Sequence, residues 1–153
     1  MTRLDLLRAW LFRLAFSYYP SYWTTGASVT SLAPDFSSAA VKLPLIWRTR
    51  NGMGTLFGGS IYGAVDPVYV VLLQRRLGDA FTVWDKAAEI DFRKPGRSTL
   101  YAEFEVPDAE VHDIRESLAP GESCDRVYDV ELVDEEGVVH ADVEKTVYVR
   151  RDE

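Results

Sequence analysis

The sequence predicts an α+β protein in which about six mostly antiparallel strands accompany one long apolar helix. The helix is predicted by the apolar segment 56–77, which is too long to be one strand. The strands are predicted by shorter segments on both sides of it, in which apolar and polar residues alternate. Turn signals at 34–35 and 134–137 join neighbouring strands as hairpins.

The composition is that of one soluble domain. A chain of 153 residues fits a single core, because domains commonly contain roughly 100–200 residues. Hydrophobic residues make up 47% and charged residues 27%, so there is enough apolar material for a packed interior. We therefore expect one domain over residues 1–153, with an amphipathic helical segment in 1–20 and the core in 24–150.

The first segment, Leu4–Phe16, is predicted to be an amphipathic helix that ends before Pro20. We expect this helix to cover the core or a neighbouring subunit as a lid. Trp10 and Phe12 keep open the alternative of a helix in a membrane interface. Two arginines interrupt its apolar run, which disfavours a secretory signal. The residues at helical spacing are Leu4, Leu7, Leu11, Leu14 and Ala15.

The remaining helices are predicted at 56–77 and 108–118, the second on the surface behind an Asp108 cap. Pro67 lies inside the long helix and predicts either a kink or a site where backbone hydrogen bonding is already broken. A sheet can cover two faces of so apolar a helix only if it curls around it. The strands are predicted at Ala27–Leu32, Ala39–Trp47, Thr82–Lys94, Thr99–Val106, Val127–Val133 and Val139–Val149.

The strand patterns predict the positions of two residues, Trp84 and Lys145. In the strand 82–94 we expect Trp84 to share one face with Ala88, Ile90 and Phe92. Lys145 is in phase with apolar neighbours of the last strand, so a buried face would place a charge among them. We interpret Lys145 as an edge or interface residue rather than a catalyst.

The segment 50–60 and the following Asp66 carry the chemistry that the sequence predicts. The free N–H of Gly58 at a helix N-terminus can polarise a thioester carbonyl. Asn51 can add a donor or orient the substrate, and the carboxylate of Asp66 can activate water or attack directly. Gly58 and Asn51 could equally form turns. A carboxylate in a largely apolar helix is harder to explain without a function.

This motif resembles that of the hotdog-fold acyl-CoA thioesterases of the phenylacetate-pathway type. In these proteins an Asn, a Gly-Gly pair that opens the central helix and an acid one to two turns later recur at the spacing of Asn51, Gly58-Gly59 and Asp66. The order of elements from Gly26 to Arg150 is similar to that of the tetrameric thioesterase-like branch. The resemblance implies a curved sheet wrapped around one helix and a site built from two chains, as a dimer or tetramer.

Two positions depart from this pattern. Phe57 stands where many relatives place a His, and Asp85 stands where relatives often carry a Ser or Thr that positions the attacking water. Two carboxylates near one water could raise the pKa of one of them, or Lys86 could neutralise Asp85. These departures keep open a rival function, a non-catalytic acyl-CoA or fatty-acid binding module. A hydratase or dehydratase activity is less favoured than these two functions, because it needs a catalytic His that the predicted central helix lacks.

The charge pattern is consistent with a small phosphorylated ligand. Relatives use basic residues in the loop after the third strand for the CoA phosphates, and the basic residues of this loop here are Arg93, Lys94 and Arg97. Gly59 and Phe57 would contact the substrate near the helix start. A net charge of −7 disfavours nucleic acid as a partner. We expect no cofactor, no metal and no membrane-spanning segment, and the lone Cys124 favours a reducing, cytoplasmic location.

Overall fold

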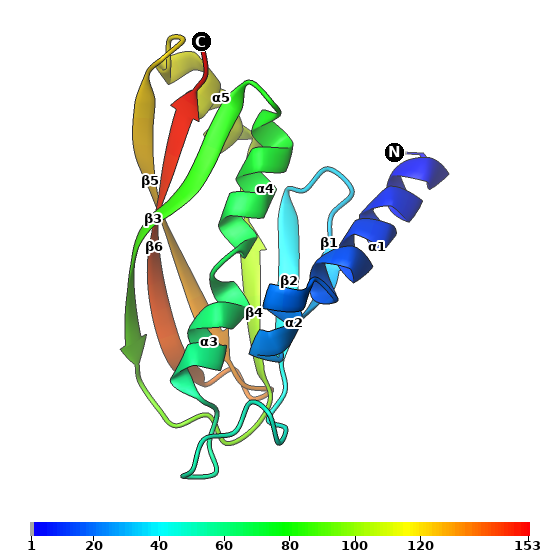
Figure 1. The fold of residues 1–153 in the computed structure, drawn as a ribbon, viewed down its shortest axis with the longest axis vertical. Coiled ribbons are helices and arrows are strands. Elements are labelled where there is room, and N and C mark those ends of the chain that lie inside the picture. Colours follow the sequence, from blue (N-terminus) through cyan, green and yellow to red (C-terminus); the bar gives the residue numbers. More distant parts are fainter. Residues whose placement is uncertain (1) are drawn as a thin grey trace.

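The computed structural model describes residues 2–153 and contains one six-stranded antiparallel sheet that curves around a central helical segment (Figure 1). The strand order is β1-β2-β4-β5-β6-β3. The predicted α+β fold class and the predicted order of elements are confirmed. The strands are β1 Ser28–Leu32, β2 Ser38–Leu43, β3 Phe81–Phe92, β4 Leu100–Glu105, β5 Ser123–Val133 and β6 Val139–Arg151.

The central helical segment is two helices, α3 Gly58–Val65 and α4 Val68–Leu77, which follow one another along the concave side of the sheet (Figure 1). The helix predicted over 56–77 begins only at Gly58 and is interrupted at Asp66 and Pro67. Pro67 has no N–H to donate to the preceding turn. Of the two alternatives predicted for Pro67, the kink in the helix is therefore the one that occurs. The flanking turns are regular: Asp66 N donates to Tyr62 O at 3.0 Å, and Val71 N donates to Pro67 O at 3.1 Å.

The sheet has two edges that differ in their surroundings. β1 forms one edge and packs against the N-terminal helix α1. β3 forms the other edge, and among the described residues its only partner strand is β6. From Trp84 to Glu89 the residues of β3 are exposed, which leaves this edge open to another strand.

A β-bulge in β3 changes which residues face the core. Asp85 lies opposite Val147 and Ala88 lies opposite Lys145, so the register skips Lys86. Because of this bulge, the residues that face the core are odd-numbered from Phe81 to Asp85 and even-numbered from Ala88 to Phe92. The predicted common phase of Trp84 with Ala88 is therefore wrong, and Trp84 is 64% exposed.

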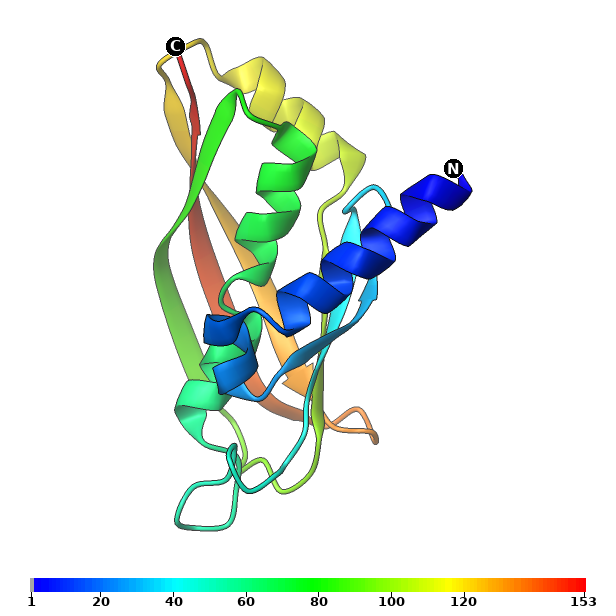
Figure 2. The ribbon, with the colours of Figure 1, turned by 45° about the vertical axis from the view of Figure 1, so that its right-hand side comes forward.

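Two helices precede the sheet. α1, Arg3–Ser17, begins with a capping box formed by Thr2 and Asp5 and agrees with the predicted helix. The sequence does not predict α2, Pro20–Thr25, because Pro20 indicates the end of the preceding helix and not the start of a new one. Here Pro20 occupies the first turn of a helix, where its fixed φ and missing N–H are tolerated. In Figure 2, α1 crosses in front of β1 and its N-terminal end projects beyond the sheet.

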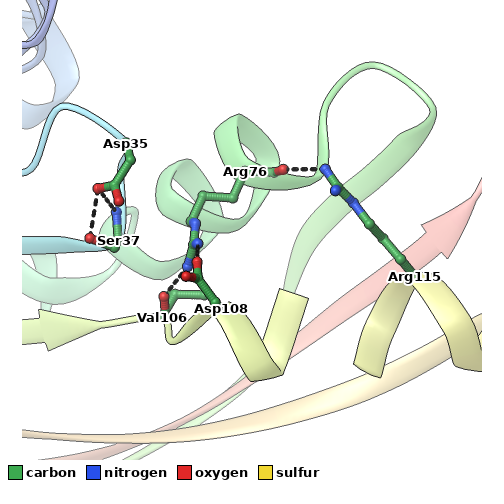
Figure 3. Close-up of polar contacts among 6 residues, drawn as sticks. All are labelled: Asp35, Ser37, Arg76, Val106, Asp108 and Arg115. Carbon is green, nitrogen blue, oxygen red and sulfur yellow. Dashed lines mark hydrogen bonds and ion pairs between the residues drawn. The ribbon is translucent and has the colours of Figure 1, made fainter. Parts of the chain in front are cut away.

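The surface helix α5, Asp108–Ser117, is joined to α4 by arginine contacts (Figure 3). Arg76 donates to the backbone oxygen of Val106 and pairs with the carboxylate of Asp108. Arg115 Nη2 donates to the backbone oxygen of Arg76 at 2.7 Å. The predicted side-chain cap by Asp108 is wrong, because Pro107 is the N-cap residue and Asp108 lies in the first turn.

Gly26 offers a test of how α2 is positioned. It ends α2 with φ of +88°, and a Cβ there would lie 2.1 Å from Thr49 Cγ2. We expect Gly26→Ala to lower the free energy of unfolding by more than about 1 kcal/mol, because an L-residue is strained at this φ and lacks space. Gly52→Ala is the control, since nothing lies within 4 Å of its Cβ position. Equal urea midpoints for the two variants would contradict this account.

Candidate active site

A buried lysine holds two aspartates together beneath the break in the central helix. Lys145 Nζ lies 2.9 Å from Asp66 Oδ1, 2.7 Å from Asp85 Oδ1 and 3.2 Å from the hydroxyl oxygen of Tyr62. An ammonium group has three donor hydrogens, so these three oxygens satisfy it completely. The Lys145 side chain has no exposed surface, whereas those of Asp66 and Asp85 are 42% and 29% exposed.

The fold explains how the four side chains of this cluster meet. Lys145 lies on β6, which is the strand between β5 and β3, and its side chain faces the helices. Asp85 lies in phase with Phe81 and Val83 before the bulge in β3, so its side chain faces the same side of the sheet. Tyr62 is one helical turn before Asp66, so both side chains lie on one side of α3. The interpretation of Lys145 as an edge or interface residue is therefore wrong.

The electrostatics of the cluster favour a charged lysine. Burial acts to lower the pKa of Lys145, but its hydrogen bonds to Asp66, Asp85 and Tyr62 outweigh this and raise the pKa above its usual value. Burial raises the pKa of Asp85, although Lys145 partly opposes that rise. Burial also raises the pKa of Tyr62, which therefore stays a neutral hydroxyl. Lys86, which the sequence suggested as a partner of Asp85, pairs instead with Asp125 at 2.5 Å.

The N-terminus of α3 presents free backbone donors, as predicted for Gly58. Among the described residues, neither Gly58 N–H nor Gly59 N–H has a hydrogen-bond partner. Two phenylalanines crowd this end of the helix. A Cβ on Gly58 would lie 3.1 Å from the ring of Phe92, and one on Gly59 would lie 2.4 Å from the ring of Phe57.

Asn51 organises its own loop. Its side-chain oxygen accepts from Met53 N at 2.9 Å and from Thr55 N at 3.1 Å. Its side-chain nitrogen donates to Thr55 Oγ1 at 2.9 Å and to the backbone oxygen of Leu56 at 3.3 Å. These contacts use the donors and acceptors that were predicted to orient a substrate. The contacts of Asn51 in this structure are therefore those of a turn residue, which was the predicted alternative to a residue that orients the substrate.

The basic loop after β3 lies beside the Asn51 loop. Leu56 N donates to the backbone oxygen of Gly96 at 2.8 Å, which ties the two loops together near the start of α3. Arg93 is already engaged, with Asp91 at 3.0 Å and Asp142 at 2.5 Å. Lys94 and Arg97 are exposed, and no ion pair to either occurs within residues 2–153.

The predicted site residues thus form two groups at opposite ends of α3. Gly58, Gly59 and Phe57 lie at its first turn, whereas Asp66 follows its last residue. Eight residues of helix rise by about 12 Å, far more than the ~3 Å at which a donor and a base act on one carbonyl. Within one chain, Asp66 and the Gly58 amide cannot contact the same thioester.

A cleft of about 480 Å³ adjoins Asp66 on the side facing the N-terminal helices. Its walls come from α1, α2 and the break between α3 and α4. The carboxylate is therefore held from one side by Lys145 and borders open space on the other. Within residues 2–153, no helix is long and apolar enough to cross a membrane, and no group of three or more possible metal ligands occurs.

A curved antiparallel sheet wrapped around a central helix defines the chain as a hotdog-fold protein. Residues 8–149 match the family described as a domain of unknown function (DUF4442), and the chain belongs to that family. None of the curated proteins matches it.

Solved structures support the fold at low sequence identity. Protein PA5026 of Pseudomonas aeruginosa, described as of unknown function and a probable thioesterase, has a TM-score of 0.79 and 17% identity, covering 92% of this chain and 93% of that chain. Thioesterase HI1161 of Haemophilus influenzae has a TM-score of 0.70 and 14% identity, with coverages of 94% and 90%. A mutant of thioesterase PA1618 of P. aeruginosa has a TM-score of 0.69 and 14% identity, with coverages of 92% and 92%. The predicted hotdog fold is confirmed, whereas the phenylacetate-type, tetrameric branch stays a prediction.

The dependence of Asp85 on Lys145 can be measured directly. Lys145 lowers the pKa of Asp85, so we expect Lys145→Met to raise that pKa further above its usual value. The carboxyl resonance of Asp85, followed by NMR between pH 3 and 8, reports this without any assay of activity. Lys86→Met is the matched control and should leave the titration unchanged, because Lys86 pairs with Asp125. An unchanged Asp85 titration in folded Lys145→Met would contradict the assignment.

Proposed function

We propose that this protein hydrolyses acyl-CoA thioesters and that Asp66 is the general base. The observation that carries the proposal is the Lys145 contact. It holds one oxygen of Asp66 at 2.9 Å while the side chain stays 42% exposed beside a cleft. A carboxylate that is held in place and open on one side has the properties that a base acting on water needs.

The proposed reaction uses water as the nucleophile. Asp66 accepts a proton from water as the water oxygen forms a bond to the thioester carbonyl carbon. The carbonyl oxygen becomes an oxyanion and accepts a hydrogen bond from the free N–H of Gly58. The C–S bond then breaks, the carbonyl re-forms as a carboxylic acid, and the CoA thiolate takes up the proton that Asp66 accepted, which returns Asp66 to its carboxylate form. Direct attack by Asp66 is the alternative chemistry, and it would pass through an enzyme-bound anhydride.

A second copy of the chain must supply the Gly58 amide, because about 12 Å of helix separates Gly58 from Asp66 within one chain. The open edge of β3 favours such an assembly, since an unpaired exposed edge can pair with the same edge of a second copy. We therefore propose a homodimer, alone or as half of a tetramer, with composite sites.

The basic loop would bind CoA in this assembly. Lys94 and Arg97 are exposed and carry the free charges of the loop, whereas Arg93 is paired with Asp91 and Asp142. The loop is tied to the segment that leads into α3, so its charges lie at the end of the molecule that offers the Gly58 amide. Asn51 supports this role indirectly, by holding the loop that precedes Gly58.

The rival function, binding of acyl-CoA without hydrolysis, is favoured by one observation. The Phe57 ring lies over Gly59, where a Cβ would be 2.4 Å away, and so crowds the approach to the helix start. Release of free CoA from a panel of acyl-CoAs separates the two functions. Saturable binding without release above background supports the binding module.

Asp66→Asn tests the base. We expect kcat to fall by about a hundredfold or more while ligand affinity changes little, because the amide cannot accept the proton from water. The measurement is CoA release from saturating acyl-CoA, with binding followed separately. Asp79→Asn is the control, since Asp79 is an exposed carboxylate at the end of α4. An Asp66→Asn variant with wild-type kcat would remove Asp66 from its role.

Gly58→Pro tests whether the site combines two chains. Proline removes the amide hydrogen yet fits the first helical position, and the φ and ψ of Phe57, −70° and 130°, suit a residue before proline. Gly58→Pro and Asp66→Asn chains should each be inactive alone. Refolded together in equal amounts, half of the dimers are mixed and carry one intact site of two, so we expect about a quarter of wild-type activity. No recovery in dimers shown to be mixed would exclude a composite site.

A further inference from the structure

The cleft beside Asp66 has apolar walls and one charged group. Phe12 and Phe16 come from α1, Tyr22 from α2, and Pro67 and Val71 from the central helical segment. Among the described residues that line the cleft, Asp66 carries the only charged side chain. An apolar cleft of this size with a single convergent charged group has the character of a small-molecule site.

The walls are held by specific contacts. Tyr22 donates its hydroxyl hydrogen to the backbone oxygen of Ala64 at 2.8 Å, and its ring stacks on that of Phe16 at 4.8 Å. A Cβ on Gly63 would lie 2.8 Å from Thr25 Cγ2, so glycine allows α2 to lie this close to α3. The cleft is therefore a built feature of the packing of α2 on α3.

The outer wall is also supported. The ring of Phe12 packs edge-on against that of Phe36, with centroids 5.1 Å apart. The guanidinium of Arg75 lies over the Phe12 ring, 4.5 Å from the centroid of that ring. Pro67 breaks the central helix at the opposite wall, where Asp66 reaches the cleft. The apolar space and the carboxylate thus meet at one point of the fold.

We propose that this cleft binds the alkyl chain of the acyl group, which makes fatty acyl thioesters the substrate class and α1 the element that limits chain length. The proposal rests on the function proposed above. The volume of about 480 Å³ lies in the range of small-molecule sites, ~300–1,000 Å³. We therefore expect an unbranched chain of medium length to fill the cleft better than a four-carbon chain does.

Charge distinguishes the substrate from its product in this cleft. Asp66 and Asp85 together carry −2 when ionised, and Lys145 carries +1, which leaves a net charge of −1 beside the bound acyl head. A thioester is neutral and meets no repulsion there, whereas a fatty-acid anion does. We therefore expect neutral alkyl ligands to bind more tightly than the corresponding carboxylates, and the acid product to leave readily.

The test combines binding and chain-length selectivity. The probe is the neutral fluorophore diphenylhexatriene, displaced by 1-decanol or by decanoate at pH 7.5. We expect decanol to displace it at concentrations at least tenfold lower than decanoate does. Ala15→Trp, which fills the cleft from α1, should weaken decanol binding at least tenfold. It should also shift the ratio of kcat/KM for dodecanoyl-CoA over butyryl-CoA at least tenfold towards butyryl-CoA.

Two further variants make the result independent of folding defects. Leu6→Trp places the same side chain on the side of α1 opposite to Ala15, at a position that is 48% exposed and outside the cleft, and should match the wild type in both measurements. Val71→Phe fills the cleft from α4 and should reproduce the effects of Ala15→Trp if that variant does not fold.

The outcomes separate this proposal from the proposed hydrolysis. If no acyl-CoA is hydrolysed but decanol binding is lost in Ala15→Trp, the cleft proposal stands and hydrolysis falls. If hydrolysis proceeds with the same chain-length preference in wild type and in both filled variants, the cleft proposal is overturned. It is also overturned if the wild type binds no decanol and Ala15→Trp dissociates the oligomer, because a second copy then occupies the cleft.

Discussion

The contact between Lys145 and the two aspartates is the interaction on which the rest of the site depends. A lysine with no exposed surface would be strongly destabilising without partners, because burying an uncompensated ammonium costs several kcal/mol. Asp66, Asp85 and Tyr62 satisfy it, and they come from the helix break, from β3 and from α3. The same contact therefore joins the central helical segment to the sheet and holds the carboxylate that we propose as the base.

Pro67 links the chemistry to the shape of the molecule. By interrupting the helix after Asp66, it places the carboxylate at a junction between Lys145 on one side and the cleft under α1 and α2 on the other. Gly63, one turn earlier, lets α2 approach closely enough to form the wall of that cleft. Gly63 and Pro67 lie within three residues of Asp66 in the sequence, so one short segment sets both the position of the acid and the approach of α2, while the remaining walls of the cleft come from α1 and α2.

The sequence predicted the fold well, because long periodic segments and hairpin turns depend on local patterns. It did not predict α2, since a helix of six residues that begins at Pro20 carries too little periodicity. It did not predict the bulge at Lys86 either, since one extra residue leaves no pattern, and it therefore placed Trp84 rather than Asp85 on the inward face. Gly58 and Asp66 were singled out from local spacing, and their roles stay predictions. Lys145 was missed because its partners lie about 60 and 80 residues away, although a lysine in phase with buried valines was the available signal.

The separation of Gly58 from Asp66 gives the proposed substrate a direction across two chains. The acyl chain would lie in the cleft of the chain whose Asp66 acts, where the walls are apolar. The thioester would then lie between that carboxylate and the α3 N-terminus of the second copy. CoA would extend from there towards Lys94 and Arg97 of the same second copy, because the loop interaction between Leu56 and Gly96 ties those charges to the start of α3. In the proposed dimer an apolar tail and the anionic CoA moiety would thus meet surfaces of matching character, one on each chain, in a protein whose net charge of −7 would otherwise repel CoA.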